Sequence, residues 1–490
     1  MRYFSTRNDK QKYTAAQAIA MGIAPDGGLF VPETIPQVGQ DVLRELCGKD
    51  YRARAAEIMK LYLEEFTPEE LEGFVRAAYA GNFDDAAVAP TRFLDDGTAF
   101  LELWHGPTCA FKDMALQMLP HLLTASLKKS GEERQVCILV ATSGDTGKAA
   151  LEGFRDVPGT RIFVFYPDGG VSKIQRLQMV TQKGANVGVS AVKGNFDDAQ
   201  TGVKQIFGDA AFAEELSKRG WFLSSANSIN WGRLLPQIAY YFSAYCDYVN
   251  SGKITLGDRI NFCVPTGNFG NILAGWFARS MGLPVNRFVC ASNANNVLTD
   301  FINTGVYDKN RPFHMTISPS MDILVSSNLE RLLYMLTGDK QTGEYMARLN
   351  AEGKYVISGA ALAEIQNTFY GGFCDDAATK AAIGALFAER GYLMDPHTAV
   401  AYRVLCDYRA KTGDETPAVV VSTASPFKFA ADVLSALGRE GDVEDPLAAL
   451  SDKTGAAIPK PLSGLSGREV RFPETVEKAD MRRAVGAFLA

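Results

Sequence analysis

The stretch VCILVATSGDTGK (136–148) joins a short apolar run to a loop of small polar residues. The apolar run is rich in β-branched residues and too short for a buried helix, so we expect a strand that is buried on both faces. The residues from Gly144 onward have the pattern of a helix that begins in the loop. The same order recurs after the apolar runs at 161–167, 186–192, 260–266, 287–292 and 418–423. Alternating units of this kind predict an α/β fold with a mostly parallel sheet flanked by helices.

The composition is that of a large globular protein. The chain has 490 residues, of which 47% are hydrophobic and 22% are charged, and a chain of this length usually forms more than one domain. Its formal net charge of −6 argues against nucleic acid as a partner, because nucleic acids bind to basic surfaces. The first residues lack the apolar core of a signal peptide, and no apolar run approaches the ~18 residues of a membrane span. We therefore expect a cytoplasmic protein with neither a nucleic-acid nor a membrane partner.

The cysteines and histidines do not form a metal-binding pattern. Eight cysteines are dispersed along the chain without a CxxC pair, and the four histidines have no HxH or HxxxH spacing. Such cysteines are typical of reduced thiols in the cytosol. We expect no metal site.

Three strand-to-helix junctions are rich in glycine and small polar residues, namely TSGDTGK (142–148), PTGNFGN (265–271) and STASPFK (422–428). Ligands of open α/β sheets bind beyond the carboxyl ends of the strands, and backbone N–H groups in such turns bind anions. The glycine spacing matches neither a nucleotide phosphate loop nor a dinucleotide-binding motif. Each loop alone could be a tight turn, but three loops at one sheet edge predict a site for an anionic ligand.

Two further segments contain candidate polar residues. SANSINWGR (225–233) places hydroxyls, carboxamides and Arg233 just before a helix. A helix cap would explain one of these side chains, whereas an arginine is suited to binding phosphate or carboxylate. In MDPHTAVAY (394–402), His397 is explained more readily as a helix-start residue than as a base.

Lys112 follows Phe111 directly in HGPTCAFKD (105–113). One interpretation is an exposed lysine with a chance aromatic neighbour. The other is a buried lysine, whose pKa would be lowered so that the amine could act as a nucleophile. A buried lysine, a Gly/Asn anion loop and a loop with a hydroxyl are together what pyridoxal phosphate requires for its aldehyde, its phosphate and its ring nitrogen.

The sequence resembles the threonine synthases of the longer type found in bacteria and fungi, which belong to the fold-type II family of pyridoxal-phosphate enzymes. The resemblance runs through nearly the whole chain. Its markers are APDGGLFVP (24–32), HGPTCAFKD (105–113), TSGDTG (142–147), VSKIQRLQM (171–179), FDDAQ (196–200), NSINWGR (227–233), PTGNFGN (265–271), SPSMDI (318–323) and DPHTA (395–399). It implies a tryptophan synthase β-like fold with two open, mostly parallel sheets flanked by helices and an extra N-terminal helical domain.

The expected division into domains follows from this resemblance and from the change of pattern along the chain. We expect an N-terminal domain over residues 1–95. A large domain over 96–130 and 226–490 would bind the cofactor. A small domain over 131–225 would carry the substrate loop.

The resemblance also implies how pyridoxal 5′-phosphate is held. Lys112 would form the Schiff base, with Phe111 beside it. Thr423 would face the ring nitrogen, and Asp145 would lie near the 3′-oxygen. The cofactor phosphate would be held by Gly267, Asn268, Phe269, Gly270 and Asn271.

The substrate residues come from two segments. The resemblance assigns Thr142 and Ser143 to the substrate carboxylate and Thr146 to its phosphate. Ser228 and Arg233 would grip the same phosphate.

Two positions stay open at this point. Many family members have TAHP at the third loop, whereas this chain has Ser425 in place of the histidine. Asp113 could cap the helix that follows it or balance the charge of Lys112.

The implied activity is that of a lyase in amino-acid biosynthesis, which converts O-phospho-L-homoserine and water to L-threonine and phosphate in the last step of threonine biosynthesis. A monomer or a homodimer would act on this small molecule. The alternatives are a phospho-lyase that releases 2-oxobutyrate from the same substrate and a threonine/serine dehydratase of the same fold. A protein that only binds ligands would not need Lys112, the phosphate loop and Arg233 together.

Overall fold

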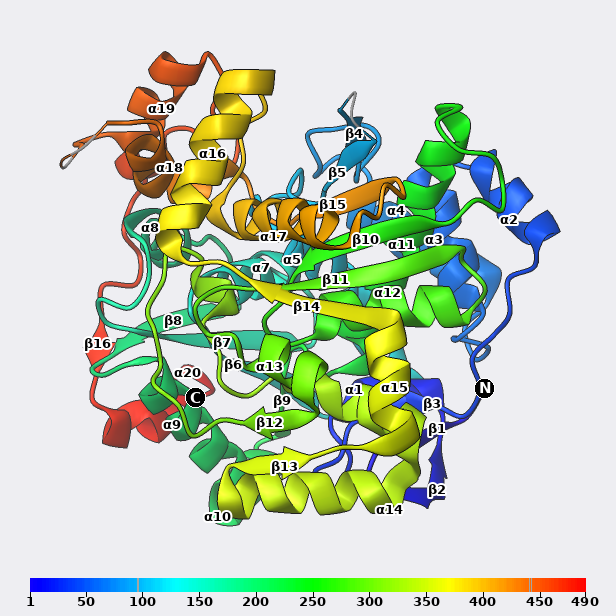
Figure 1. The fold of residues 1–490 in the computed structure, drawn as a ribbon. Coiled ribbons are helices and arrows are strands. Elements are labelled where there is room, and N and C mark those ends of the chain that lie inside the picture. The colour runs from blue at the N-terminus through cyan, green and yellow to red at the C-terminus, as the bar shows by residue number, and fades with distance from the viewer. Residues whose placement is uncertain (95–96, 440, 442) are drawn as a thin grey trace.

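Two open sheets form the frame of the structure, which is a computed structural model that describes residues 1–94, 97–439, 441 and 443–490 (Figure 1). Among these residues, the larger sheet has six strands in the spatial order β14-β11-β10-β15-β5-β4, and the smaller has five in the order β16-β8-β7-β6-β9. Neighbouring strands run parallel except for β4 and β5. The fold class predicted from the sequence is confirmed.

The strands of these two sheets are β4 (Thr91–Phe93), β5 (Thr98–Glu102), β6 (Gln135–Ala141), β7 (Thr160–Pro167), β8 (Val187–Val192), β9 (Trp221–Ser224), β10 (Ile260–Pro265), β11 (Val285–Ser292), β14 (Phe369–Phe373), β15 (Ala418–Ser422) and β16 (Thr475–Val476). The remaining strands form two small antiparallel sheets and are β1 (Tyr3–Ser5), β2 (Asn8–Tyr13), β3 (Phe30–Pro32), β12 (Val306–Asp308) and β13 (Lys354–Val356).

The helices are α1 (Ala15–Met21), α2 (Gln40–Cys47), α3 (Tyr51–Lys60), α4 (Pro68–Tyr79), α5 (Lys112–Leu116), α6 (Leu119–Lys129), α7 (Asp145–Phe154), α8 (Lys173–Val180), α9 (Phe196–Gly208), α10 (Ala210–Lys218), α11 (Trp231–Asn250), α12 (Gly270–Ser280), α13 (Val297–Thr304), α14 (Leu329–Glu352), α15 (Gly359–Thr368), α16 (Asp376–Arg390), α17 (Pro396–Thr412), α18 (Ala430–Ala436), α19 (Pro446–Thr454) and α20 (Met481–Phe488). The 3-10 helices are η1 (Pro319–Met321), η2 (Pro426–Phe429), η3 (Leu465–Gly467) and η4 (Lys478–Asp480). In the part of the chain that the structure describes, no helix combines the length and the apolar character needed to cross a membrane.

Helices cover both faces of the larger sheet. α17 packs against β10, β11 and β15 on one face, and α12 packs against β10 and β11 on the other (Figure 1). α11 packs against α12 and is buried along nearly its whole length. These layers explain why the central strands have consecutive apolar residues rather than apolar residues at alternate positions only.

The smaller sheet separates two apolar layers, and alternate side chains of β6 point into each of them. Val136, Ile138 and Val140 belong to the main core that also contains α7 residues, whereas Cys137 and Leu139 belong to a separate cluster with α9 and α20. Successive side chains of a strand point to opposite faces, so one apolar run serves both layers.

The N-terminal segment contains the helices α1 to α4, in agreement with the expected helical character, and in addition the antiparallel sheet β2-β1-β3. The sequence does not predict this sheet, because its strands are short and β1 pairs with the distant β3, Ser5 opposite Phe30. The segment shares the core of the larger sheet. The ring of Tyr3, for example, lies 5.5 Å from that of Trp231 in α11.

The end of the chain returns to the smaller sheet. β16 pairs in parallel with β8, and α20 packs against α9 (Figure 1). The predicted division into domains stays a prediction, and its boundary at residues 95 and 96 lies outside the described residues. A division by sheet alone would group residues 475–490 with the small domain instead of the large one.

Candidate active site

The segment that carries Lys112 lies against the loop that carries Thr423. The Phe111 N–H donates to the Thr423 carbonyl at 2.8 Å, and the Ser425 N–H donates to the Cys109 carbonyl at 3.0 Å. These two bonds flank an antiparallel bridge between the segments. β5 and β15 are neighbours in the sheet, so both segments leave it at the same edge.

Lys112 is buried, with 8% of its surface exposed. Its Nζ lies 2.9 Å from the Ser320 Oγ and 3.5 Å from the Asp145 Oδ2, and it lies 5.5 Å from the centroid of the Phe111 ring. Burial lowers the pKa of Lys112 to about 8; Asp145 opposes this shift, and Arg233 and Lys428 reinforce it. The structure therefore supports the buried nucleophile over the exposed lysine.

A second buried lysine, Lys428 of η2, lies beside the first. Its Nζ is 2.7 Å from the Asp145 Oδ1 and donates to the Thr108 carbonyl at 2.9 Å. Although burial alone would raise the pKa of Asp145, Lys428 and Lys112 hold it well below its usual range. Asp145 also accepts a hydrogen bond from Gln175 at 2.9 Å. The sequence prediction did not include Lys428. Its position between Phe427 and Phe429 has the same pattern as Lys112 after Phe111, a lysine next to an aromatic residue.

The PTGNFGN loop connects β10 to α12. Phe269 has a left-handed backbone with φ of 61° and precedes the first residue of the helix. The carbonyls of Gly267 and Asn268 accept hydrogen bonds from Ser326 and Asn328, which fixes the loop. The first N–H groups of a helix have no partner within it, so this loop offers donors to an anion.

Asn271 supplies an observation that tests whether the loop fits a phosphate. Its Oδ1 accepts hydrogen bonds from the hydroxyls of Tyr240 at 2.5 Å and Tyr241 at 2.8 Å. Its Nδ2 is buried and has no hydrogen-bond partner among the described residues. A buried donor without an acceptor costs about 1–3 kcal/mol. A phosphate oxygen would remove this cost, so the loop fits the cofactor phosphate.

The TSGDTG loop is closed by the side chain of its first residue. The Thr142 Oγ1 accepts the N–H groups of Gly144 at 3.0 Å and Gly147 at 2.9 Å. The predicted contact of Thr142 with a substrate carboxylate would use the hydrogen of this hydroxyl. Ser143 is partly exposed at the turn. Thr146 follows in the first turn of α7, where the helix dipole favours an anion.

Arg233 joins this loop to the segment before α11. Its Nη1 donates to the Ala226 carbonyl at 2.7 Å, and its Nη2 lies 3.5 Å from the Thr146 Oγ1. Burial lowers the pKa of Arg233 to about 10. Asn230 is the cap of α11, as expected for one residue of this segment, because its side chain accepts the Gly232 N–H.

Ser228 lies on the side of the phosphate loop. A Cβ built on Gly270 would be 3.8 Å from the Ser228 Cβ and 3.3 Å from the Asn328 Nδ2. The segment that holds Ser228 and Arg233 therefore lies against both the PTGNFGN loop and the TSGDTG loop, and the phosphate grip of these two residues stays a prediction.

The third loop holds Thr423 and the unusual Ser425. Thr423 is buried, and its N–H donates to the Thr398 hydroxyl at 3.3 Å. The Ser425 Oγ accepts the Phe427 N–H at 3.3 Å and caps η2. In this chain the side chain at position 425 therefore has a local structural partner.

Asp113 has neither of the two roles considered for it. Both of its carboxylate oxygens accept hydrogen bonds from Thr108, at 2.8 Å from the N–H and 2.7 Å from the hydroxyl. Burial raises the pKa of Asp113 to about 6, although these bonds oppose the shift. Asp113 thus fixes the turn before Lys112, and the carboxylate next to Lys112 is that of Asp145.

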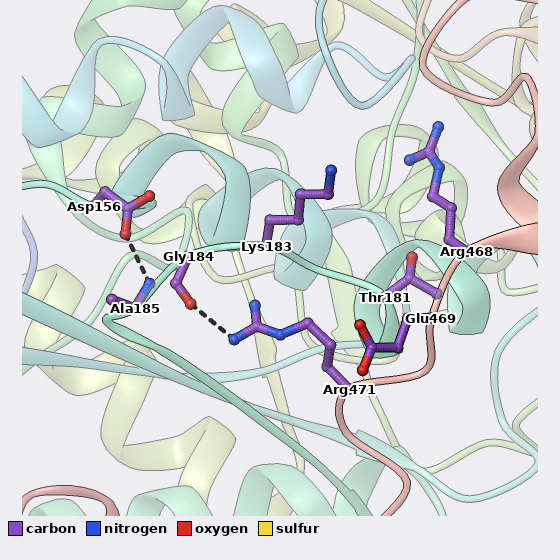
Figure 2. A pocket seen from close by; sticks show the side chains of 8 residues that line it. All are labelled: Asp156, Thr181, Lys183, Gly184, Ala185, Arg468, Glu469 and Arg471. Atoms are coloured by element: carbon purple, nitrogen blue, oxygen red, sulfur yellow. Dashed lines mark hydrogen bonds between the residues drawn. The ribbon is translucent and has the colours of Figure 1, made fainter.

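A separate pocket of about 520 Å³ lies on the smaller-sheet side of the molecule, where the C-terminal segment crosses the end of α8 (Figure 2). Arg471 donates to the carbonyls of Gln182 and Gly184, and Asp156 accepts the Ala185 N–H. The two Arg471 bonds tie the C-terminal segment to the loop before β8. Three cationic side chains and two carboxylates line the pocket, namely Lys183, Arg468, Arg471, Asp156 and Glu469, so its charge is mixed.

Comparison with known proteins agrees with this arrangement. The family described as "Pyridoxal-phosphate dependent enzyme" matches residues 99–424. The families described as "Threonine synthase N terminus" and "Threonine synthase, C-terminal" match residues 2–79 and 398–485. The chain belongs to the pyridoxal-phosphate-dependent enzymes, and its cofactor is pyridoxal 5′-phosphate, as predicted.

Similar proteins show which family within this class of enzymes the chain belongs to. The human protein "Threonine synthase-like 1" is 41% identical over 445 residues, which is 87% of this chain, and this chain spans only 59% of that protein. The threonine synthase of Pseudomonas aeruginosa is 40% identical over 88% of this chain and 89% of its own length. The solved structure of pyridoxal-phosphate-bound threonine synthase from Brucella melitensis matches with a TM-score of 0.88 and 36% identity, over 100% of this chain and 98% of that one. Within its class, the chain belongs to the threonine synthase family.

Proposed function

We propose that the protein is a threonine synthase, a lyase that converts O-phospho-L-homoserine and water to L-threonine and phosphate. The observation that carries this proposal is the approach of Arg233, from α11, to Thr146, from α7, near the buried Lys112. A buried guanidinium and a hydroxyl at a helix N-terminus suit a phosphate group on the substrate. A substrate without a phosphate would leave the Arg233 charge uncompensated in a buried place.

The residues that would hold the cofactor come from the loop before α12, from the start of α7 and from the loop after β15. The first N–H groups of α12 and the Asn271 Nδ2 would bind its phosphate. Asp145 and Thr423 would contact its ring. When bound, pyridoxal phosphate supplies an electron sink for the charge that develops at the substrate Cα.

Lys112 is the residue that we propose moves the protons. With a pKa of about 8, about a tenth of its amine is neutral at pH 7 and about half at pH 8, and the neutral Nζ removes the proton from Cα. The carboxylate of Asp145, 3.5 Å away, stabilises the ammonium that results. Arg233 and Thr146 hold the departing phosphate and stabilise its negative charge.

A product assay tests the proposal. The purified protein, loaded with pyridoxal phosphate, should form threonine and phosphate from O-phosphohomoserine in equal amounts. The variant Lys112→Ala should lose turnover by about a thousandfold or more, whereas Lys129→Ala, on the surface, should not. A 2-oxo acid without threonine would instead identify the phospho-lyase, and turnover of unphosphorylated threonine or serine would identify the dehydratase.

We propose further that the enzyme works in the cytoplasm on this small molecule, as a monomer or a homodimer, without nucleic acid or membrane as a partner. The dispersed cysteines and the net charge of −6 support this setting. Sedimentation at micromolar concentration distinguishes the monomer from the homodimer.

A further inference from the structure

Two of the segments that mark the family resemblance, SPSMDI and DPHTA, meet beside Lys112, and neither has been assigned a role in the reaction. Ser320 lies in η1 and His397 lies in the first turn of α17. The Ser320 N–H donates to the His397 Nε2 at 3.2 Å. The Ser320 Oγ accepts a hydrogen bond from the Lys112 Nζ at 2.9 Å. A continuous path of contacts therefore connects α17 to the reactive amine.

His397 is held in one orientation and one tautomer. Its Nδ1 lies 2.8 Å from the Asp395 Oδ1. Because the Nε2 accepts the Ser320 N–H, the proton of the ring must be on the Nδ1, which donates it to Asp395. The ring is 2% exposed and packs edge-on against Phe429, with 4.9 Å between the ring centroids. His397 is thus a rigid acceptor for the backbone of Ser320 and has no free nitrogen with which to move protons.

Asp395 is equally fixed. Its side chain is buried, accepts the N–H of His397 at 2.9 Å and also accepts the hydroxyl of Thr398. It caps α17 at the same time. The position of the His397 ring is therefore set by the start of a helix that packs on the larger sheet.

We propose that Ser320 orients the amine of Lys112, and that Asp395 and His397 are positioning residues that hold Ser320 in place. This inference rests on the proposed function, in which Lys112 moves protons. A hydrogen bond from one N–H of Lys112 to the Ser320 Oγ fixes the directions of the other positions on the nitrogen, including the lone pair that receives a proton. Without it, the flexible lysine side chain would sample several orientations.

The same hydrogen bond affects the charge of Lys112. The charged groups that face the Nζ are Asp145 from α7, Lys428 from η2 and Arg233 from α11. Ser320 adds a neutral acceptor, which stabilises the ammonium more than the amine. Loss of the Ser320 hydroxyl should therefore move the titration of Lys112 to lower pH, whereas a general loosening of the fold would expose Lys112 and move it to higher pH.

The first test uses Ser320→Ala and Ser320→Thr. In the loaded enzyme, Ser320→Ala should lower kcat for O-phosphohomoserine by about 10- to 100-fold and leave KM within about threefold, while Ser320→Thr, which keeps the hydroxyl, should restore most of kcat. In the full-length chain freed of cofactor, labelling of Lys112 with trace acetic anhydride, followed by mass spectrometry across the pH range, reports its titration. We expect the midpoint of Ser320→Ala to lie up to about one pH unit below that of the wild type. An unchanged kcat or an unchanged midpoint would overturn the proposal.

The second test separates positioning from packing. His397→Gln keeps an acceptor for the Ser320 N–H. His397→Phe keeps an aromatic ring that can pack against Phe429 but removes the acceptor. His397→Phe should reproduce the kcat loss and the downward midpoint shift of Ser320→Ala, and His397→Gln should reverse most of both. Equal behaviour of the two variants would refute the role of His397. The labelling measurement does not depend on turnover, so it still decides the proposal if the wild type does not make threonine.

Discussion

The Nζ of Lys428 lies 2.7 Å from the Oδ1 of Asp145, and the two side chains are only 0% and 3% exposed. The other carboxylate oxygen of Asp145 lies 3.5 Å from the Nζ of Lys112. One carboxylate therefore balances two lysines. Lys428 takes the shorter contact, and its positive charge helps to keep the pKa of Lys112 low. The pKa of the catalytic amine thus stays below its usual value although a carboxylate is next to it.

The variant Lys428→Met should strongly destabilise the protein. Methionine fills a similar volume, but it leaves the charge of Asp145 buried with a weaker partner, at a cost of about 3–5 kcal/mol in the free energy of unfolding. Urea denaturation measures this change. The matched control is Lys193→Met, which breaks an exposed ion pair with Glu477 and should cost less than about 1 kcal/mol. If both variants lost the same free energy of unfolding, the buried ion pair would contribute no more to stability than the exposed one.

Substitution of Gly267 should disturb the phosphate loop. A Cβ at this position would lie 2.6 Å from the carbonyl oxygen of Ser320, so one of the two backbones must move. We expect Gly267→Ala to lower the free energy of unfolding by about 1–3 kcal/mol and to weaken cofactor binding, measured by equilibrium titration of the visible absorbance. Gly343→Ala, in α14 with no atom within 4 Å of the new Cβ, should be neutral or slightly stabilising. Normal cofactor affinity in Gly267→Ala would argue against a rigid loop.

Arg233→Lys should weaken substrate binding more than it weakens the fold. Lysine keeps the charge but loses the fork of donors, one of which approaches Thr146 at 3.5 Å. The KM for O-phosphohomoserine should rise by about 10- to 100-fold, as expected for the loss of a hydrogen bond to a charged group. Arg471→Lys, in the pocket of Figure 2, should leave KM unchanged. A lower kcat with an unchanged KM would assign Arg233 a role other than phosphate binding.

His105 should make stability depend on pH. Burial alone would lower its pKa, but hydrogen bonds with Asp84 at 2.6 Å and Glu102 at 2.9 Å outweigh this and raise the pKa to about 9. Since the unfolded value is about 6.5, protonated His105 stabilises the fold fully below about pH 6.5, and this contribution is lost as the pH rises through about 9. The free energy of unfolding, measured by urea denaturation, should be roughly 2 kcal/mol higher for the wild type than for His105→Gln near pH 6. This difference should shrink near pH 10. His314→Gln, at an exposed site, is the control; a difference that is constant with pH would exclude a charged His105.

The sequence predicts the central strands well because they are buried on both faces and read as unbroken apolar runs. β6, β10 and β15 lie within one residue of the expected positions. β1, β3 and β16 were not predicted, because two or three residues carry no periodic signal and their partners are far away in the chain. Secondary structure that depends on distant pairing becomes visible only in three dimensions.

The predicted site residues are brought together to different degrees. Asp145 reaches Lys112 directly, Thr423 is joined to it through the backbone of Phe111, and Arg233 reaches Thr146. Ser320 lies in the marker segment SPSMDI, but the sequence did not assign it a role, because its contact with Lys112 is visible only in the structure. Glycine patterns in a sequence indicate backbone sites for anions. The role of a single serine, in contrast, can be inferred only from the residues that contact it in the structure.

The return of the chain to the smaller sheet protects the protein against aggregation. With β16 in place, the last two residues of β8 are paired on the outer edge, and Met481 and Val485 of α20 are buried in the apolar layer on α9. Loss of the last residues, from 475 onward, would leave β8 with unpaired N–H and carbonyl groups beside an uncovered apolar surface. Such an open edge promotes association between chains. A protease cut in the segment between α19 and β16 should therefore be followed by aggregation, even though the residues around Lys112 would be untouched.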